Sequence, residues 1–353
     1  MGEEYSLNIF KRRSFIIIVL TLGLLFLIPV ASSIGLRNVT FLDALKILLG
    51  VNSTEVDSIT LWLRLRRVLV GVIVGGLLGG SGVIAQAVYR NPLASPFTLG
   101  ISQAAALGVA VALLFGYAGR FYPFFYSISR PYLLPVMAFV FALLQSMLVL
   151  SLAYKAGLSP HALVLSSIAL SFLYQSILAL LQYLVLNELQ VATIVFWTFG
   201  DLSRPGDMEL LILAIGFIPM LIAYMFIHID LDLVSLGDDL SLASGINPRR
   251  FRLVAMIIAS LGTSLATSFV GVLAFLCLLA PHIARGVVGA SHKYLLPASI
   301  LIGSILTVLA DTLSRNILYP LTLPVGITLS FMGAPLLIYM LIRGISYGGY
   351  KSS

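Results

Sequence analysis

Long apolar runs separated by short polar segments make up almost the whole chain. A helix that crosses a membrane needs roughly 20 mostly apolar residues, because backbone groups without hydrogen-bond partners are too costly in hydrocarbon. This criterion predicts about ten spans. They lie near residues 14–34, 66–88, 98–116, 132–154, 161–186, 209–229, 249–269, 271–289, 295–314 and 325–342. We therefore expect an all-α, polytopic membrane protein with a single transmembrane domain over residues 1–353.

The composition supports this fold class. Hydrophobic residues make up 59% of the chain and charged residues 10%, and the mean hydropathy is +1.06, whereas soluble domains carry about 25% charged residues. The first apolar run follows Lys11, Arg12 and Arg13, and its length favours a retained helix over a cleaved signal peptide. The single cysteine, Cys277, excludes a disulfide framework and a thiolate metal cluster.

The distribution of basic residues tests the orientation. With both termini in the cytoplasm, slightly more than half of the 21 basic residues fall on the cytoplasmic side, as the positive-inside rule requires. Arg64, Arg66 and Arg67 weaken the bias, because they cluster at the outer start of the second predicted span. Two interpretations fit this cluster: the arginines extend to lipid headgroups, or they form a basic patch that binds an acidic partner.

Two further features lie on or after the second span. Gly71, Gly75 and Gly79 follow one another at four-residue spacing, which predicts a smooth helix face for close packing. The stretch 90–96 then contains Asn91, Pro92 and Pro96, so a continuous helix cannot pass through it. This turn is either a plain connection on the inner face or the border of a pathway, where irregular backbone is tolerated at membrane depth.

A polar insert, residues 235–250, separates the sixth and seventh spans. Its first eleven residues, 235–245, predict one short amphipathic helix with Ser235 or Gly237 as cap. Asp238 and Asp239 lie where a helix amino terminus favours negative charge, and Gly245 with Asn247–Pro248 ends the helix. Such a helix either lies along the membrane surface or serves as a contact for a cytoplasmic partner.

The outer side of the predicted bundle holds two more features. Asp311 and Arg315 lie one turn apart in the ninth span, and this spacing indicates either a structural pair or an ion relay at Asp311. A longer outer segment, 187–207, connects the fifth and sixth spans. The chain contains neither a P-loop nor a His-Glu-x-x-His motif, so it cannot hold nucleotide phosphates in the P-loop manner, and transport is the natural function class.

Ordered motifs along nearly the whole chain resemble those of one permease family. They are Arg64-Leu-Arg-Arg67-Val, Ser81-Gly-x-x-x-Gln86, Arg90-Asn-Pro-Leu-Ala-Ser-Pro96, Trp197-Thr-Phe-Gly200, Ser235-Leu-Gly-Asp-Asp239, Ala280-Pro-His-Ile-Ala-Arg285, Leu295-Leu-Pro297, Leu309-Ala-Asp311, Leu323-Pro-Val-Gly326 and Gly333-Ala-Pro335. The chain is similar to the type II ABC importer permeases for iron siderophores, haem and vitamin B12.

This resemblance implies the architecture and the partners. It implies a homodimer with ten helices per subunit and a pathway at the dimer interface, two ATP-binding subunits and an extracytoplasmic substrate-binding protein. The chain itself is then no enzyme and binds no cofactor, no metal and no nucleic acid, since ATP is used by the partner subunit. The expected location is the lipid of a prokaryotic cytoplasmic membrane, crossed many times.

The resemblance also implies three sets of functional residues. The coupling helix that contacts the ATPase lies within 235–245 and includes Ser235, Leu236, Gly237, Asp238, Asp239, Ala243 and Gly245. The residues that meet the binding protein are Arg64, Arg67 and Arg315, and those at the cytoplasmic gate are Asn91, Pro92 and Leu93. Two departures concern these sets: Arg66 stands where the family has proline, and Ser95 stands where it commonly has an acid.

Two other function classes remain as alternatives. An ion-gradient-driven secondary transporter would use Asp311 as its coupling carboxylate, and a structural or receptor protein would bind no ATPase. The transported compound is open among iron chelates, haem, cobalamin and smaller oxyanions, because the predicted spans carry mostly apolar or small side chains.

Overall fold

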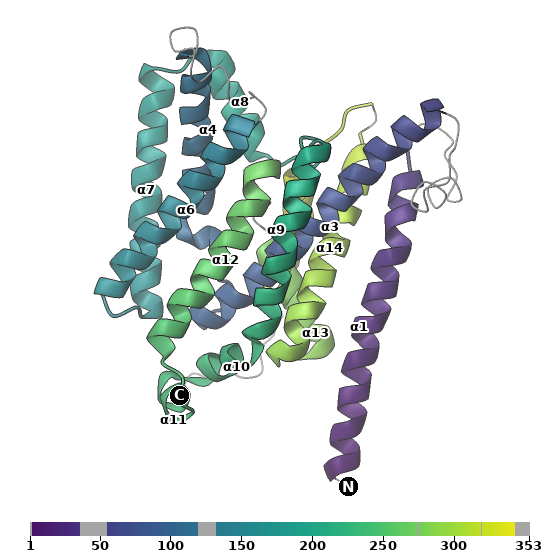
Figure 1. Cartoon of the computed structure of the whole chain (residues 1–353), viewed down its shortest axis with the longest axis vertical. Coiled ribbons are helices and arrows are strands. Elements are labelled where there is room, and N and C mark those ends of the chain that lie inside the picture. The colour runs from purple at the N-terminus through teal and green to yellow at the C-terminus, as the bar shows by residue number, and fades with distance from the viewer. Residues whose placement is uncertain (1, 36–54, 119–131, 274, 319, 343–353) are drawn as a thin grey trace.

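The computed structural model describes residues 2–35, 55–118, 132–273, 275–318 and 320–342. Every regular element in these ranges is a helix (Figure 1). They are α1 (Gly2–Ser33), α3 (Glu55–Tyr89), the 3₁₀ helix η1 (Pro96–Leu99), α4 (Ile101–Ala118), α6 (Leu133–Lys155), α7 (Pro160–Leu184), α8 (Glu188–Thr198), α9 (Asp207–Phe226), α10 (His228–Leu236), α11 (Asp238–Ala243), α12 (Pro248–Val270), α13 (Leu276–Val288), α14 (His292–Asn316) and α15 (Val325–Ile342).

The predicted all-α membrane fold with about ten spans is confirmed. Seven of the described helices are long and apolar enough to cross a membrane, and three shorter apolar helices, in α4, α13 and α15, fall on the other predicted spans. The reason is simple: only a helix satisfies the backbone of a long apolar segment within the segment itself.

Helix α3 forms the centre of the bundle. It crosses the molecule obliquely between α14, α12 and α13, and almost all of its apolar stretch is buried (Figure 1). In α1, α7 and α9 only a small share of the apolar residues is buried, as in helices next to lipid. Helix α1 stands at one side of the bundle and packs against α14 and α3.

The glycine series of α3 lies against α14. At Gly75 and Gly79 the backbone of α14 comes so close that an added Cβ would overlap the carbonyl groups of Gly303 and Ser299. Two serines of α14 strengthen the contact, since Ser299 Oγ donates to Gly79 O at 2.9 Å and Ser304 Oγ donates to Val72 O at 2.7 Å. Small residues with hydroxyl donors are the usual means of close helix association in membranes.

Three chain segments meet at the connection between α12 and α13. Asp201 N donates to Val270 O at 2.7 Å, and Gly326 N donates to Gly200 O at 3.4 Å, so residues 199–201, 270–273 and 324–326 are tied together. Gly271 has φ +86°, a conformation that residues with a side chain rarely adopt. A Cβ atom at this position would also meet the backbone of Trp197 and Gly200. The motifs Trp197–Gly200 and Leu323–Gly326 therefore meet at one crossing of the chain, where Trp197 and Val325 are buried.

Helix boundaries differ from the prediction at three places. Helix α3 begins at Glu55, so Arg64, Arg66 and Arg67, predicted at the start of a span near 66–88, lie about three turns inside the helix. The connection 187–207 contains helix α8, which begins with a capping box between Asn187 and Gln190. The single helix predicted over 235–245 is wrong, because Gly237, with φ +144°, separates α10 from α11.

Candidate functional site

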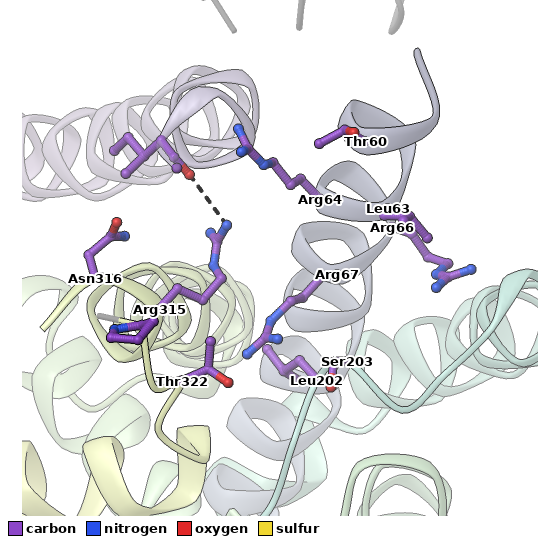
Figure 2. A pocket seen from close by; sticks show the side chains of 13 residues that line it. Thr60, Leu63, Arg64, Arg66, Arg67, Leu202, Ser203, Arg315, Asn316 and Thr322 are labelled. Carbon is purple, nitrogen blue, oxygen red and sulfur yellow. Dashed lines mark hydrogen bonds between the residues drawn. The ribbon is translucent and has the colours of Figure 1, made fainter. Parts of the chain in front are cut away.

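The three arginines predicted to dock a partner lie around one pocket at the upper end of the bundle (Figure 2). The pocket has a volume of about 620 Å³ and is bordered by the ends of α1, α3 and α14 and by the loop after α8. Arg64 and Arg67 point from α3 toward the side on which Arg315 of α14 lies, whereas Arg66 points away from it. We call this end of the bundle the arginine end.

A buried carboxylate organises the arginine end. The side chain of Asp311 is 1% exposed, and Arg67 Nε donates to its Oδ1 at 2.6 Å. Arg315 Nε lies 3.1 Å from the second oxygen of Asp311, although without the angle of a hydrogen bond. Arg67 also lies 3.7 Å from Asp201 in the loop after α8. The predicted Asp311–Arg315 pair is thus part of a larger cluster.

The same arginines hold the end of α1. A helix leaves its last carbonyl groups without intrahelical partners. Arg315 donates to Ala31 O at 3.1 Å and to Ile34 O at 3.5 Å (dashed in Figure 2), and Arg64 donates to Ser33 O at 3.4 Å. The cluster therefore connects three helices that are far apart in the chain.

Arg66, the departure from the family pattern, has a different partner. Its Nη1 lies 3.0 Å from Asp207 at the start of α9, and Trp62 Nε1 donates to the same carboxylate oxygen at 3.0 Å. The Asp207 side chain is 65% exposed, so this pair lies in the open. Arg66 thus belongs to the rim, outside the Asp311 cluster.

The residues predicted to contact an ATPase form a corner at the opposite end of the bundle, which we call the α11 end. Helix α10 ends at Leu236, and α11 turns away after Gly237. Ser241 fixes the corner, because its buried hydroxyl lies 2.6 Å from Gly237 O and 3.1 Å from Leu233 O. The outer surface carries exposed acidic and apolar side chains: Leu236, Asp239, Leu240 and Leu242.

Asp238 lies on the inner side of this corner. It forms ion pairs with Arg90, which follows α3, and with Arg252 of α12. Burial raises the pKa of the Asp238 carboxyl, but the hydrogen bond and charge of Arg252 and the charge of Arg90 outweigh burial, so the pKa lies below its ordinary value. A second tie joins α10 to α14, where Asp232 Oδ1 accepts from His292 N at 2.9 Å.

The predicted gate turn borders a cavity. Asn91 Oδ1 accepts from Leu93 N at 2.9 Å, and Ala94 N donates to Asn91 O at 3.0 Å, which closes a tight turn. The cavity beside it measures about 400 Å³, and its polar lining includes Gln103 of α4 and Gln175 of α7. The Leu93 side chain is 59% exposed.

Five charged residues at the two ends of the bundle were not predicted as partners. They are Asp201, Asp207, Arg90, Arg252 and Asp232. Each is separated from its partner by many residues, and one sequence carries no signal of such pairing. Among the described residues no group of three or more histidines, cysteines and acids is placed to hold a metal ion.

Comparison with known proteins gives a consistent result. The model of the FecCD transport family matches residues 21–343. A protein of Methanocaldococcus jannaschii assigned as an ABC transporter permease is 37% identical, over 97% of each chain. The Fe(3+)-citrate import system permease protein of Bacillus subtilis is 34% identical, over 94% of this chain and 96% of its own.

A solved structure agrees with the fold. It is an inward-facing conformation of an ABC transporter assigned to the metal-chelate type, and it superposes with a TM-score of 0.80 at 26% identity. The match covers 94% of this chain and 99% of the other. The arrangement of the helices is therefore shared over nearly the whole of both chains.

Proposed function

Because the chain belongs to the FecCD transport family, we propose that it is the membrane-spanning subunit of an ATP-driven importer for an iron chelate, a siderophore complex or haem. It is a multi-pass ABC transporter permease. The iron-citrate relative favours iron chelates over cobalamin as the transported class. ATP is bound by a separate subunit, and this chain holds no cofactor.

The observation that carries the proposal is the corner at the α11 end. Leu236, Leu240 and Leu242 are exposed there by 69%, 47% and 57%, next to an acidic residue and outside the apolar spans. Exposed leucines at a firmly fixed corner between two short helices are costly in water and are typical of a surface that binds a protein. A cleft on an ATP-binding subunit is the partner that we propose for this surface.

Two copies of the chain are proposed to enclose the pathway. A mostly apolar groove of about 500 Å³ lies along α15, beside the end of α8 and the connection before α13, and Phe331 of α15 is 72% exposed. Two ATP-binding subunits and an extracytoplasmic binding protein complete the assembly. Asp311, the coupling carboxylate of the alternative secondary transporter, is held between two arginines, and this arrangement does not favour an ion relay.

The proposal is tested by uptake into liposomes. The vesicle lumen represents the cytoplasm. We expect iron-citrate uptake by the permease to require the ATP-binding subunit and ATP in the lumen and the binding protein outside the vesicle. Ionophores that collapse ion gradients are expected to leave the rate unchanged. Uptake driven by an ion gradient without ATP would contradict the proposal, as would a complex whose mass contains one permease copy.

A charge reversal tests the docking surface at the arginine end. Arg64→Glu is expected to raise the Kd for the binding protein by at least about tenfold at low salt, because attraction to acidic residues becomes repulsion. Salt weakens the difference by screening. Arg250→Glu, an exposed position at the α11 end, makes the same change in net charge and serves as control. Equal affinities of the two variants would show that the pocket is no docking surface.

A further inference from the structure

One carboxylate, Asp238, receives arginines from two different parts of the bundle. Arg252 of α12 donates from Nη1 to Oδ2 at 3.1 Å and from Nη2 to Oδ1, and Arg90 donates from Nη2 to the same Oδ1. The neighbouring Asp239 is exposed on the outer side of α11. The two consecutive acids therefore face different surroundings: the first faces the spans, and the second faces outward.

Arg252 is the fixed member of this group. It is the largest fully buried side chain among the described residues, with 1% of its surface exposed. A buried guanidinium is costly without a carboxylate partner, so the Arg252–Asp238 pair resists separation. Two oxygens of Asp238 accept from two nitrogens of Arg252, and such bidentate pairing also fixes the direction of the carboxylate.

Arg90 is the member that leads to the gate turn. It follows directly after α3 with φ +48°, and Asn91 is the next residue. Its Nε donates to Val234 O at 3.0 Å, so one side chain holds both the end of α10 and the start of α11. A displacement of α11 thus acts on the residue from which the turn at 91–93 begins.

We propose that Asp238 is a positioning residue that transmits movement of α11 to the gate turn at residues 91–93 through Arg90, with Arg252 as its anchor. This inference rests on the proposed function, because it needs an ATP-binding subunit that moves α11. Contact with that subunit is made by Asp239 and the exposed leucines. Asp238 acts inside the permease.

The test measures the gate and the partner contact separately. Leu93→Cys is introduced as a probe for a membrane-impermeant maleimide; the native Cys277 is fully buried. The permease is studied in lipid nanodiscs with its ATP-binding subunit, and labelling rates are compared without nucleotide and with ATP and vanadate. Affinity for the ATP-binding subunit is measured on the same samples.

Two neighbouring substitutions are expected to have opposite effects. Asp238→Asn reduces the nucleotide-dependent change in labelling at least about fivefold, the lower end of typical coupling between sites, and leaves the affinity for the ATP-binding subunit within about twofold. Asp239→Asn weakens that affinity and keeps the labelling change at saturating partner. If Asp238→Asn weakens affinity and keeps the labelling change, the proposal is overturned.

Arg90→Gln separates transmission from folding, because it leaves the pairing of Asp238 with the buried Arg252 intact. We expect the same loss of labelling change as with Asp238→Asn, and the double variant is expected to lose no more than either single one, since both act through one contact. An unchanged response in Arg90→Gln would refute the proposal, whatever Asp238→Asn does. If the unmodified protein neither binds the ATP-binding subunit nor responds to nucleotide, the proposed function fails.

Discussion

Gly79→Ala is expected to destabilise the protein by at least about 2 kcal/mol, because it pushes α3 away from α14. The added methyl group would overlap the carbonyl of Ser299, which belongs to the backbone and cannot rotate away. The hydrogen bond from Ser299 Oγ to Gly79 O is lost as the helices separate. The intrinsic preference of alanine for helix, about 1 kcal/mol over glycine, acts in the opposite direction and is already included.

Gly71→Ala is the matched control on the same helix. The nearest atom to a methyl group there is Leu202 Cδ1, at 3.2 Å, the end of a flexible side chain. We expect this variant to unfold at the same detergent concentration as the parent or at a higher one. The measurement is unfolding in mixed micelles titrated with a denaturing detergent. Equal midpoints for Gly79→Ala and Gly71→Ala would show that the close crossing contributes little.

Asp311→Asn is expected to cost about 3 kcal/mol of stability, because it leaves two arginines near each other without their shared buried carboxylate. The side chains of Arg67 and Arg315 are 14% and 13% exposed, so water solvates their charges only in part. Since Arg315 also holds the end of α1, the loss should include weaker packing of that helix. Protection of α1 amides from hydrogen exchange reports this directly.

Asp207→Asn is the control for the Asp311 prediction. It removes a carboxylate from an arginine pair in the same way, but Asp207 is 65% exposed. Exposed pairs contribute little to stability, so its unfolding is expected to match the parent. Two results together would instead make Asp311 an ion-coupling group. Asp311→Asn would be as stable as Asp207→Asn, and ionophores would slow transport by the parent protein but not by Asp311→Asn.

The spans were predictable because their signal is local. Length and apolar character alone identify them, and each predicted span corresponds to an apolar helix. The span near 66–88 marks only the apolar part of α3, and the helix itself begins at Glu55. Arg66 and Arg67 therefore lie within the helix, where Asp207, Asp201 and Asp311 pair with them. The capping box between Asn187 and Gln190 is a sequence signal for the start of α8, and it was not among the predicted features.

The clusters at the two ends were predictable only in part. Asp238 was predicted, together with Asp239, at a helix amino terminus within the coupling helix, whereas the structure turns Asp238 toward Arg90, 148 residues away in the chain. Whether an acid faces inward or outward depends on the rotation of a six-residue helix about its axis. The break at Gly237, where φ is +144°, separates α11 from α10 and so sets that rotation apart from the preceding helix.

The capping of α1 by distant arginines has a consequence for biosynthesis. Arg64 follows Ser33 by 31 residues, whereas Arg315 follows Ile34 by 281 residues. At a translation rate of about 5–20 residues per second, Arg315 emerges roughly 15 to 55 s after Ile34. During this interval the end of the first helix depends on headgroups, water and Arg64. The end of the first helix therefore obtains its last hydrogen-bond donor only when α14, near the end of the chain, has been synthesised.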